Sequence, residues 1–182
     1  GGNGGGTYVG LFAINDSETG TVVVGAGGTG STTTGGVGVS STFLFPSAGS
    51  PNGTITGLGG NGGTNKPTGT NDIYIAVPNA TEKGGSATAV NAVFLDGYSI
   101  FGNFGGCGMT FDRNIGVSGV GGSTYLSTGG DPKAINNSNT RTNGASGSTN
   151  TGSGGSGAIQ TNNSQTGTGG AGGSGVVIIY EY

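Results

Sequence analysis

Glycine recurs with a period of three along several stretches of this 182-residue chain. In residues 167–175, Thr168, Ala171 and Ser174 fall at every third position, and glycine fills all the positions between them. This spacing fits neither an α-helix, with a period of about 3.6, nor a strand, with a period of about two. It fits the polyproline-II helix, which has about 3 residues per turn. We therefore expect this stretch to form a polyglycine-II helix.

A helix of this type needs neighbours, because it has no internal hydrogen bonds to satisfy its backbone polar groups. Glycine has no Cβ and so lets backbones approach closely enough for lateral hydrogen bonds. The triplet pattern recurs in residues 57–63, and in shorter form in 25–30, 119–122 and 152–157. The sequence thus predicts a non-helical fold: a sandwich-like array of polyglycine-II helices with short flanking β-strands, long loops and essentially no α-helix. The glycines expected to be structural are Gly57, Gly59, Gly60, Gly62, Gly63, Gly169, Gly170, Gly172 and Gly173.

The composition supports one ordered domain without a conventional core. Glycine accounts for 47 residues, so packed large apolar side chains cannot be the main source of stability. Short apolar blocks such as TVVV, FLF and VVIIY argue against a disordered chain, and the short triplet runs with only five prolines argue against collagen. We expect residues 1–63 to hold a hairpin and triplets, 64–118 a less repetitive aromatic segment, and 119–182 a polar loop, triplets and a terminal strand. No Met begins the chain, so we also expect an upstream part.

Local patterns predict the strands and loops between the triplets. Residues 7–14 and 21–24 are rich in β-branched and aromatic residues, and the turn-forming NDSETG between them indicates a hairpin. Residues 64–103 and 125–151 lack triplets and are expected to leave the array as loops or small excursions. Further strands are expected at 42–45 and 72–77, in 86–95, which we interpret as extended rather than helical, and at the C-terminus, with Val176, Ile178, Tyr180 and Tyr182 on one face.

Charge and motif spacing exclude several functions. Only five Lys and Arg stand against eight Asp and Glu, scattered singly, so we expect no nucleic-acid partner. No run reaches the roughly 18 apolar residues of a membrane span, so we expect no membrane insertion. Residues 25–30 match the dinucleotide-binding pattern GxGxxG, but four further matches show that composition explains it, and we expect no cofactor.

Catalytic and metal-binding arrangements are also lacking. The chain has no histidine, which removes the commonest general base and metal ligand. The carboxylate pairs Asp96 with Asp112, or Asp16 with Glu18, could in principle hydrolyse a glycosidic bond, but solvated turn residues explain them better. Cys107 is the single cysteine, so neither an intrachain disulfide nor a cysteine metal cluster can form. We expect neither an enzyme nor a metal site.

Two segments carry a resemblance to a known family. TGTVVVGAGGTGSTTTGGVGVSSTF is similar to the glycine-rich domain at the distal ends of bacteriophage tail fibres, and GGAGGSGVVIIYEY resembles the C-terminus of the same domains. The alternation of glycine-rich and variable segments also resembles the detachable tail-fibre adhesins of large tailed phages, whose variable segments recognise the host. The resemblance implies an extracellular location on the virion. It also implies a host cell-surface receptor, protein or glycan, and other fibre subunits as partners, with a homo-oligomer possible.

The resemblance implies a receptor-binding tail-fibre tip, and the residues offer a mechanism for it: variable loops on a rigid glycine-rich scaffold. Loop aromatics and polar side chains supply contact area and adaptable hydrogen bonds. The alternative is a structural, self-assembling fibre or sheath subunit without receptor binding. The residues expected to contact the receptor are Tyr74, Tyr98, Tyr125, Asn137, Asn139 and Arg141.

Overall fold

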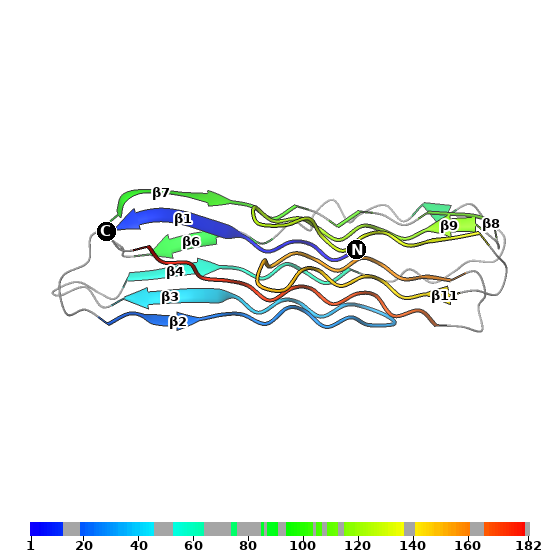
Figure 1. Cartoon of the computed structure of the whole chain (residues 1–182), viewed down its shortest axis with the longest axis horizontal. Helices are drawn as coiled ribbons and strands as arrows, with labels where there is room; N and C mark the ends of the chain where they lie inside the picture. Colours follow the sequence, from blue (N-terminus) through cyan, green and yellow to red (C-terminus); the bar gives the residue numbers. More distant parts are fainter. Residues whose placement is uncertain are drawn as a thin grey trace.

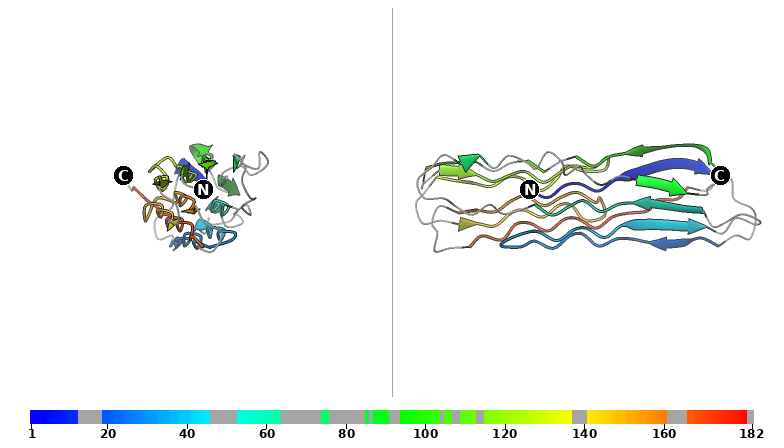
Figure 2. Two further views of the ribbon diagram at one scale, coloured as in Figure 1. Left: turned by 90° about the vertical axis from the view of Figure 1, so that its right-hand side faces the viewer. Right: turned by 180° about the vertical axis from the view of Figure 1, so that it is seen from behind.

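The chain runs back and forth along one long axis, so that its glycine-rich segments lie side by side in a rod (Figure 1). No α-helix occurs among the described residues, which confirms the non-helical prediction. The view down the rod in Figure 2 (left) shows the glycine-rich segments as narrow coils, and the reverse view (right) shows β-strands at the two ends of the rod. In this computed structural model the described residues are 1–12, 19–45, 53–63, 74–75, 85, 87–90, 94–103, 105–106, 109–112, 115–136, 141–160 and 166–180.

Residues 1–6 show the bonding of the array most completely. Their N–H groups turn through three directions, and each direction meets one neighbouring segment: 152–155, 58–61 or 101–106. Because residues three apart donate to the same neighbour, the segment has the threefold symmetry of a polyglycine-II helix. The donor and acceptor pairs are Gly2–Gly155 and Gly5–Gly152 at 2.9 Å, Asn3–Asn61 and Gly6–Leu58 at 2.9 Å, and Gly4–Asn103 at 3.0 Å.

The array accepts neighbours that run in either direction. Gly169, Gly172 and Gly175 donate to the carbonyl oxygens of Ser31, Gly28 and Gly25, so residues 169–175 run antiparallel to 25–31. In contrast, Gly144 and Gly147 donate to Thr168 and Ala171 at 2.9 Å, so residues 144–147 run parallel to 168–171. Lateral hydrogen bonds of this kind, each contributing about 0.5–1.5 kcal/mol, join segments far apart in the sequence.

Antiparallel strands close both ends of the rod. At one end β1 pairs with β7, and a four-stranded sheet has the order β2-β3-β4-β6; at the other end a sheet of order β10-β9-β8-β5 lies near the pair β11-β12 (Figure 1). The strands are β1 (Thr7–Phe12), β2 (Thr21–Val23), β3 (Ser41–Phe45), β4 (Gly53–Gly57), β5 (Tyr74–Ile75), β6 (Ala87–Val90), β7 (Phe94–Ile100), β8 (Met109–Asp112), β9 (Ile115–Val117), β10 (Ala134–Ile135), β11 (Arg141–Thr142) and β12 (Ile159–Gln160).

Buried side chains in the described part of the chain are few and small. Ile135 and Ile159 are the buried apolar ones, whereas the buried polar ones are Ser118, Ser153 and Ser156. Ser153 and Ser156 come from the triplet run GSGGSG, where the third position faces the interior instead of solvent. Within the described residues, lateral backbone hydrogen bonds are far more numerous than buried apolar side chains.

Close packing explains most of the glycines expected to be structural. A Cβ on Gly60 would overlap the carbonyl oxygen of Asn3, and one on Gly170 would overlap that of Ala145. Gly169 differs, because a Cβ there would lie 3.5 Å from the nearest atom, the carbonyl oxygen of Ser31. The steric requirement therefore falls on particular faces of each helix. A Cβ would also overlap neighbouring backbone at Gly59, Gly62, Gly63 and Gly173, would lie 2.9 Å from Gly6 at Gly57, and would lie 3.3 Å from Gly28 at Gly172.

Two predictions of local strands are wrong. β1 pairs with β7, and β2 with β3, so the expected hairpin of residues 7–14 and 21–24 does not form. After β2 the chain continues as a polyglycine-II helix, turns at residues 31–34 and runs back, so that residues 36–39 bond to residues 26–29. The returning chain leads into β3, which therefore lies beside β2. Residues 176–180 form no strand ladder with the described residues, contrary to the expected terminal strand.

The predicted polar loop at 125–151 is also wrong over most of its length. Residues 127–133 and 143–148 belong to the array: Gly121 donates to Gly130 at 2.9 Å and Gly147 to Ala171 at 2.9 Å. A segment that meets neighbours closely on only some faces needs fewer glycines, so polar residues can fill its other positions. The predictions for 42–45 and 86–95 are confirmed where the structure describes these residues, in β3, β6 and the start of β7, and β5 lies within the strand expected at 72–77.

Candidate functional site

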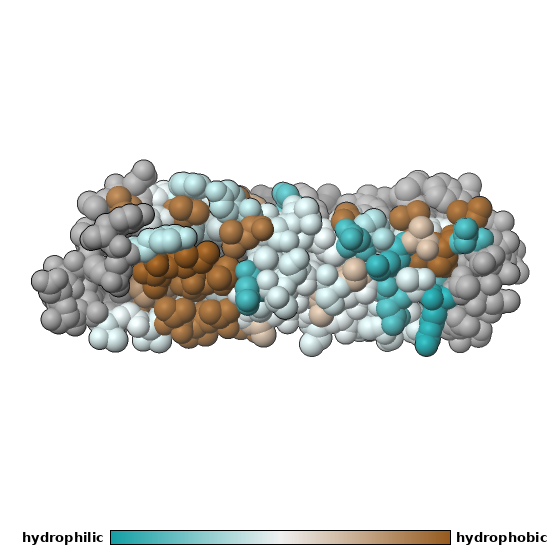
Figure 3. All heavy atoms as spheres, viewed as in Figure 1, coloured by the Kyte–Doolittle hydropathy of each residue, from teal (hydrophilic) through white to brown (hydrophobic). Residues whose placement is uncertain are grey.

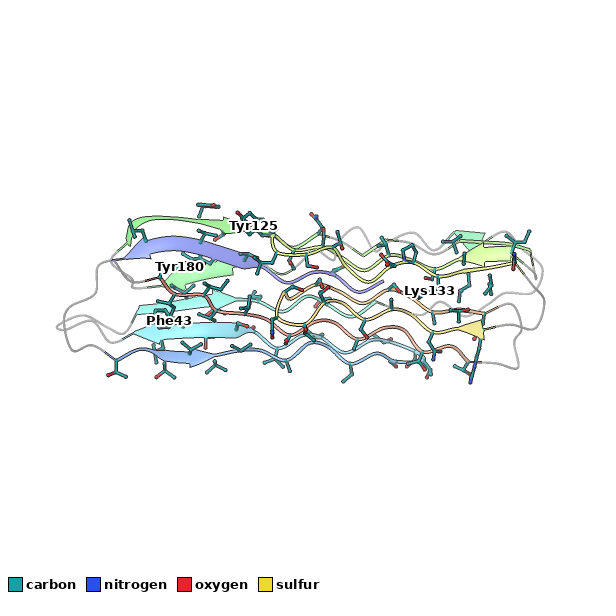
Figure 4. All side chains as sticks on the ribbon, viewed as in Figure 1. Phe43, Tyr125, Lys133 and Tyr180 are labelled. Carbon is teal, nitrogen blue, oxygen red and sulfur yellow. The ribbon has the colours of Figure 1, made fainter. Side chains whose placement is uncertain are left out.

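The residues predicted to bind a receptor lie in three places along the rod. Tyr74 in β5 and Arg141 in β11 lie at one end, Tyr98 in β7 lies at the other, and Tyr125 lies at a turn between them (Figures 1 and 4). Asn137 and Asn139 fall outside the described residues, in the interval between β10 and β11. The structure therefore does not join all of the predicted residues into one site.

The end that carries β5 and β8–β12 has a small apolar anchor. Ile135 of β10 and Ile159 of β12 are 8% and 6% exposed, and their strands, which belong to different ladders, lie in contact. On β9 the pattern is reversed: Ile115 and Val117 are 50% and 39% exposed, with buried Gly116 between them. This end thus combines a fixed backbone with an exposed pair of apolar side chains.

Three polar side chains fix the backbone where the chain re-enters the array at residues 166–168. Arg141 Nη1 donates to the carbonyl oxygen of Thr166 at 3.1 Å. The amide oxygens of Gln160 and Asn143 accept from the backbone N–H groups of Gly167 and Thr168, at 3.1 Å and 3.0 Å. These contacts come from β11, β12 and the residue after β11, so the strand ends and the returning chain are held as one unit.

Arg141 has donors to spare for a ligand. Its side chain is exposed, and the bond to Thr166 uses one of the five N–H donors of a guanidinium group. The planar guanidinium can bind a carboxylate or phosphate through two parallel hydrogen bonds. Because the bond to Thr166 restricts the side chain, less conformational entropy is lost when a ligand binds.

Lys133 lies on the same half of the rod and is held through its backbone (Figure 4). Its carbonyl oxygen accepts from Ser118 N at 2.7 Å, and its N–H donates to Ser118 Oγ at 2.8 Å. Ser118 is 3% exposed, so this two-way bond is shielded from water. The base of the Lys133 side chain is therefore fixed relative to β10, which follows it directly.

Tyr125 projects from a turn in the middle of the rod and is 63% exposed (Figure 4). Thr124 N donates to Ser127 O at 2.8 Å, which closes the turn, and Thr124 Oγ1 donates to Thr151 O at 2.8 Å, which ties it to the neighbouring turn. Tyr125 is thus presented on an ordered backbone, but at a distance from either end.

Tyr98 lies on the β1–β7 ribbon at the opposite end. It is 55% exposed and faces Val9, which is 37% exposed, in the antiparallel register. Residues directly opposite in such a pair share one face of the ribbon, so Tyr98 and Val9 form a small exposed apolar surface. Leu11, 50% exposed, extends that surface along β1.

Sequence reasoning did not find Gln160 and Asn143. Each acts through a hydrogen bond to backbone N–H groups that lie 7 and 25 residues away in sequence. No local motif indicates such partners, because amide side chains are common in this chain and the pairing depends on which segments become neighbours.

The described residues contain neither a cluster of metal-binding side chains nor a membrane-spanning helix. Within the described ranges, no three His, Cys, Asp or Glu side chains come together as a possible metal site. The same part of the chain contains no helix that is long and apolar enough to cross a membrane.

Comparison with known families gives one match. The model of a family described as a glycine-rich domain matches residues 1–182, which is the full length of the chain. The chain belongs to this glycine-rich domain family. Neither curated proteins nor solved structures gave a match.

Proposed function

We propose that this protein is the receptor-binding tip of a bacteriophage tail fibre, or an adhesin carried at such a tip, and that it recognises a protein or glycan on the bacterial surface. The observation that carries the proposal is the end formed by β5 and β8–β12, where Arg141, Asn143 and Gln160 all bond to the backbone of residues 166–168 and the Arg141 side chain is exposed. We place the receptor contact there.

The array gives this end the rigidity that a binding module needs. Each segment is bonded laterally to several others along its length, so the strand ends are held by the whole rod. Preorganised groups bind more tightly because less conformational entropy is lost on binding. The rod can therefore present different end sequences on the same scaffold.

The chemistry at this end suits a polar, partly anionic surface molecule. Arg141 supplies several N–H donors, and Ile115 and Val117 supply exposed apolar area at the same end of the rod. Tyr74 belongs to β5, the edge strand of the neighbouring sheet, and adds a residue with a hydroxyl group to this end, whereas the predicted contacts Asn137 and Asn139 lie outside the described residues. Carboxylates, phosphates and sugar hydroxyls are the groups that such a set recognises.

The distribution of hydropathy supports the choice of end. In Figure 3, strongly hydrophilic residues gather on the half of the rod that leads to β11, and the largest hydrophobic area covers the half with β2, β3 and β4. A virion-surface protein that meets a hydrated cell surface is better served by the polar end.

A cell-binding assay with the fluorescently labelled domain tests the proposal. A panel of bacterial strains is screened for saturable binding, and the variants Arg141→Gln and Tyr98→Ser are compared on the strain that binds. We expect Arg141→Gln to weaken binding at least tenfold, or about 1.4 kcal/mol, and Tyr98→Ser to leave it unchanged. If only Tyr98→Ser weakened binding, the contact would lie at the opposite end. If no strain bound the domain, the receptor-binding function would be rejected.

A further inference from the structure

The four-stranded sheet β2-β3-β4-β6 has an apolar edge. β2 is its outermost strand, and all three of its residues are exposed. Val22 and Val23 are 45% and 50% exposed, and Val24, the next residue, is 49% exposed. An edge strand of this kind offers a row of backbone donors and acceptors to another strand. Native proteins usually protect such an edge with charges or proline, and the sequence TVVV has neither.

The C-terminal segment, residues 176–180, is a short apolar segment that has no strand partner among the described residues. Its sequence is VVIIY, and Ile178, Ile179 and Tyr180 are 58%, 50% and 76% exposed. The last backbone hydrogen bond of this part of the chain, within the described residues, is Gly175 N to Gly25 O at 2.9 Å. Four of its five residues are β-branched, which favours an extended conformation.

The two elements begin at one point and then separate. Gly175 N donates to Gly25 O; Val176 follows Gly175 in the sequence, and Val24 precedes Gly25. A Cβ on Gly175 would overlap the hydroxyl of Ser41, where β3 begins. Beyond that point, the terminal segment diverges from β2 in Figure 1 and in the reverse view of Figure 2. Figure 3 shows the hydrophobic area that the two elements leave exposed in this half of the rod.

The register of the array shows that the two sequences match. Gly169, Gly172 and Gly175 bond to Ser31, Gly28 and Gly25, so the paired residue numbers sum to 200. The same antiparallel register carried one step further would set Ile178 opposite Val22 and Val176 opposite Val24. Four uncharged, β-branched residues, Val176 to Ile179, would then lie opposite the four uncharged, β-branched residues Thr21 to Val24.

We propose that the terminal segment of one copy adds as a strand to β2 of a second copy, and that the second copy returns the same contact. The occupant is a second copy because this chain carries both halves of the interface: within the described residues, β2 has no partner on its outer side and the terminal segment has no strand partner. The terminal segment of each copy also runs away from its own β2. β2 and the terminal segment both lie next to the hydrogen bond between Gly175 and Gly25, so one twofold axis can relate the two reciprocal contacts. Strand addition would pair both sets of backbone groups and bury the valines and isoleucines.

The oligomeric state of the full chain in solution is the first test. Light scattering after size-exclusion chromatography is run over a range of concentrations for the unmodified chain, Val23→Lys, Ile178→Lys and the control Val37→Lys. Val37 is 62% exposed in the glycine-rich segment before β3, outside the proposed contact. We expect dimers for the unmodified chain and the control, and loss of the dimer for the other two variants. A monomer at every concentration, or equal loss in the control, would overturn the proposal.

Disulfide trapping separates exchange between copies from closure within one copy. In a Cys107→Ser background, one preparation carries Val22→Cys and another carries Ile178→Cys. Mixing the two under oxidation should give a disulfide-linked dimer that contains one chain of each kind. The double variant at low concentration reports closure onto its own edge. An intrachain disulfide there without a mixed dimer, or dimers that form only between identical single variants, would overturn reciprocal strand addition.

Discussion

Ser156 and Ala145 bond to each other in both directions: Ser156 N donates to Ala145 O at 2.8 Å, and Ala145 N donates to Ser156 Oγ at 2.8 Å. Ser156 is 1% exposed, so its hydroxyl replaces a backbone acceptor in the interior of the array. Ser153 does the same for Ser148 N at 3.0 Å. Buried serine is therefore part of the lateral hydrogen bonding, along with the glycines.

Ser156→Ala should lower the free energy of unfolding by about 1–3 kcal/mol, because it leaves the Ala145 N–H without an acceptor where water cannot easily enter. Ser146 is the matched control, because it follows Ala145 in the same polyglycine-II segment and its side chain is exposed. Ser146→Ala should change stability by less than about 0.5 kcal/mol. Denaturant titration measures both. Equal effects in the two variants would show that the hydroxyl of Ser156 does not support the array.

Gly170→Ala and Gly169→Ala compare two faces of one helix. A Cβ on Gly170 would overlap the carbonyl oxygen of Ala145, whereas one on Gly169 has its nearest atom at 3.5 Å. We expect Gly170→Ala to destabilise the protein by about 1–3 kcal/mol through overpacking. Gly169→Ala should be neutral, or stabilising by about 0.4–1 kcal/mol, because alanine restricts the unfolded chain. Thermal melts of the two variants should therefore shift differently, and matching shifts would contradict the packing found here.

The fold class could be predicted from the sequence because period three with two glycines in each triplet has one compatible backbone geometry. Neighbours could not be predicted, since every triplet run offers the same lateral donors and acceptors. β1 and β7 illustrate this: Thr7 pairs with Ile100 across the whole of the intervening chain, whereas local turn rules favour residues 21–24 as the partner.

Segments with one glycine per triplet were the other source of error. In NGASG, Gly144 and Gly147 are three residues apart and bond to one neighbour, but the polar residues between them resemble a loop. Of the candidate site, Arg141 was predictable as an exposed cation in a polar stretch. Gln160 and Asn143 were not, because they fix a backbone that reaches them only through the folded array.

Gly60→Val and Asn61→Val test whether glycine is needed at particular positions of a triplet. A Cβ on Gly60 would overlap the carbonyl oxygen of Asn3, but the side chain of Asn61 is exposed. Gly60→Val should push residues 1–6 away and leave lateral hydrogen bonds unmade, at about 1–3 kcal/mol for each buried group without a partner. Asn61→Val should keep its backbone bond to Asn3 and most of the stability. Melting temperatures that fall equally would refute this difference between adjacent positions.

Gly152→Ala isolates the cost of backbone conformation from the cost of packing. Gly152 has a φ of 70°, in the left-handed region, and follows the turn in which Asn150 has a φ of 59°. A Cβ on Gly152 would lie 3.8 Å from its nearest neighbour, Thr124 Cγ2, so alanine has room there. The expected loss of about 1–2 kcal/mol therefore comes from the left-handed conformation alone. Gly169→Ala, which also has room but no positive φ, serves as the control, and denaturant titration of the pair gives the difference. If the two alanine variants were equally stable, this turn would not require a left-handed residue at position 152.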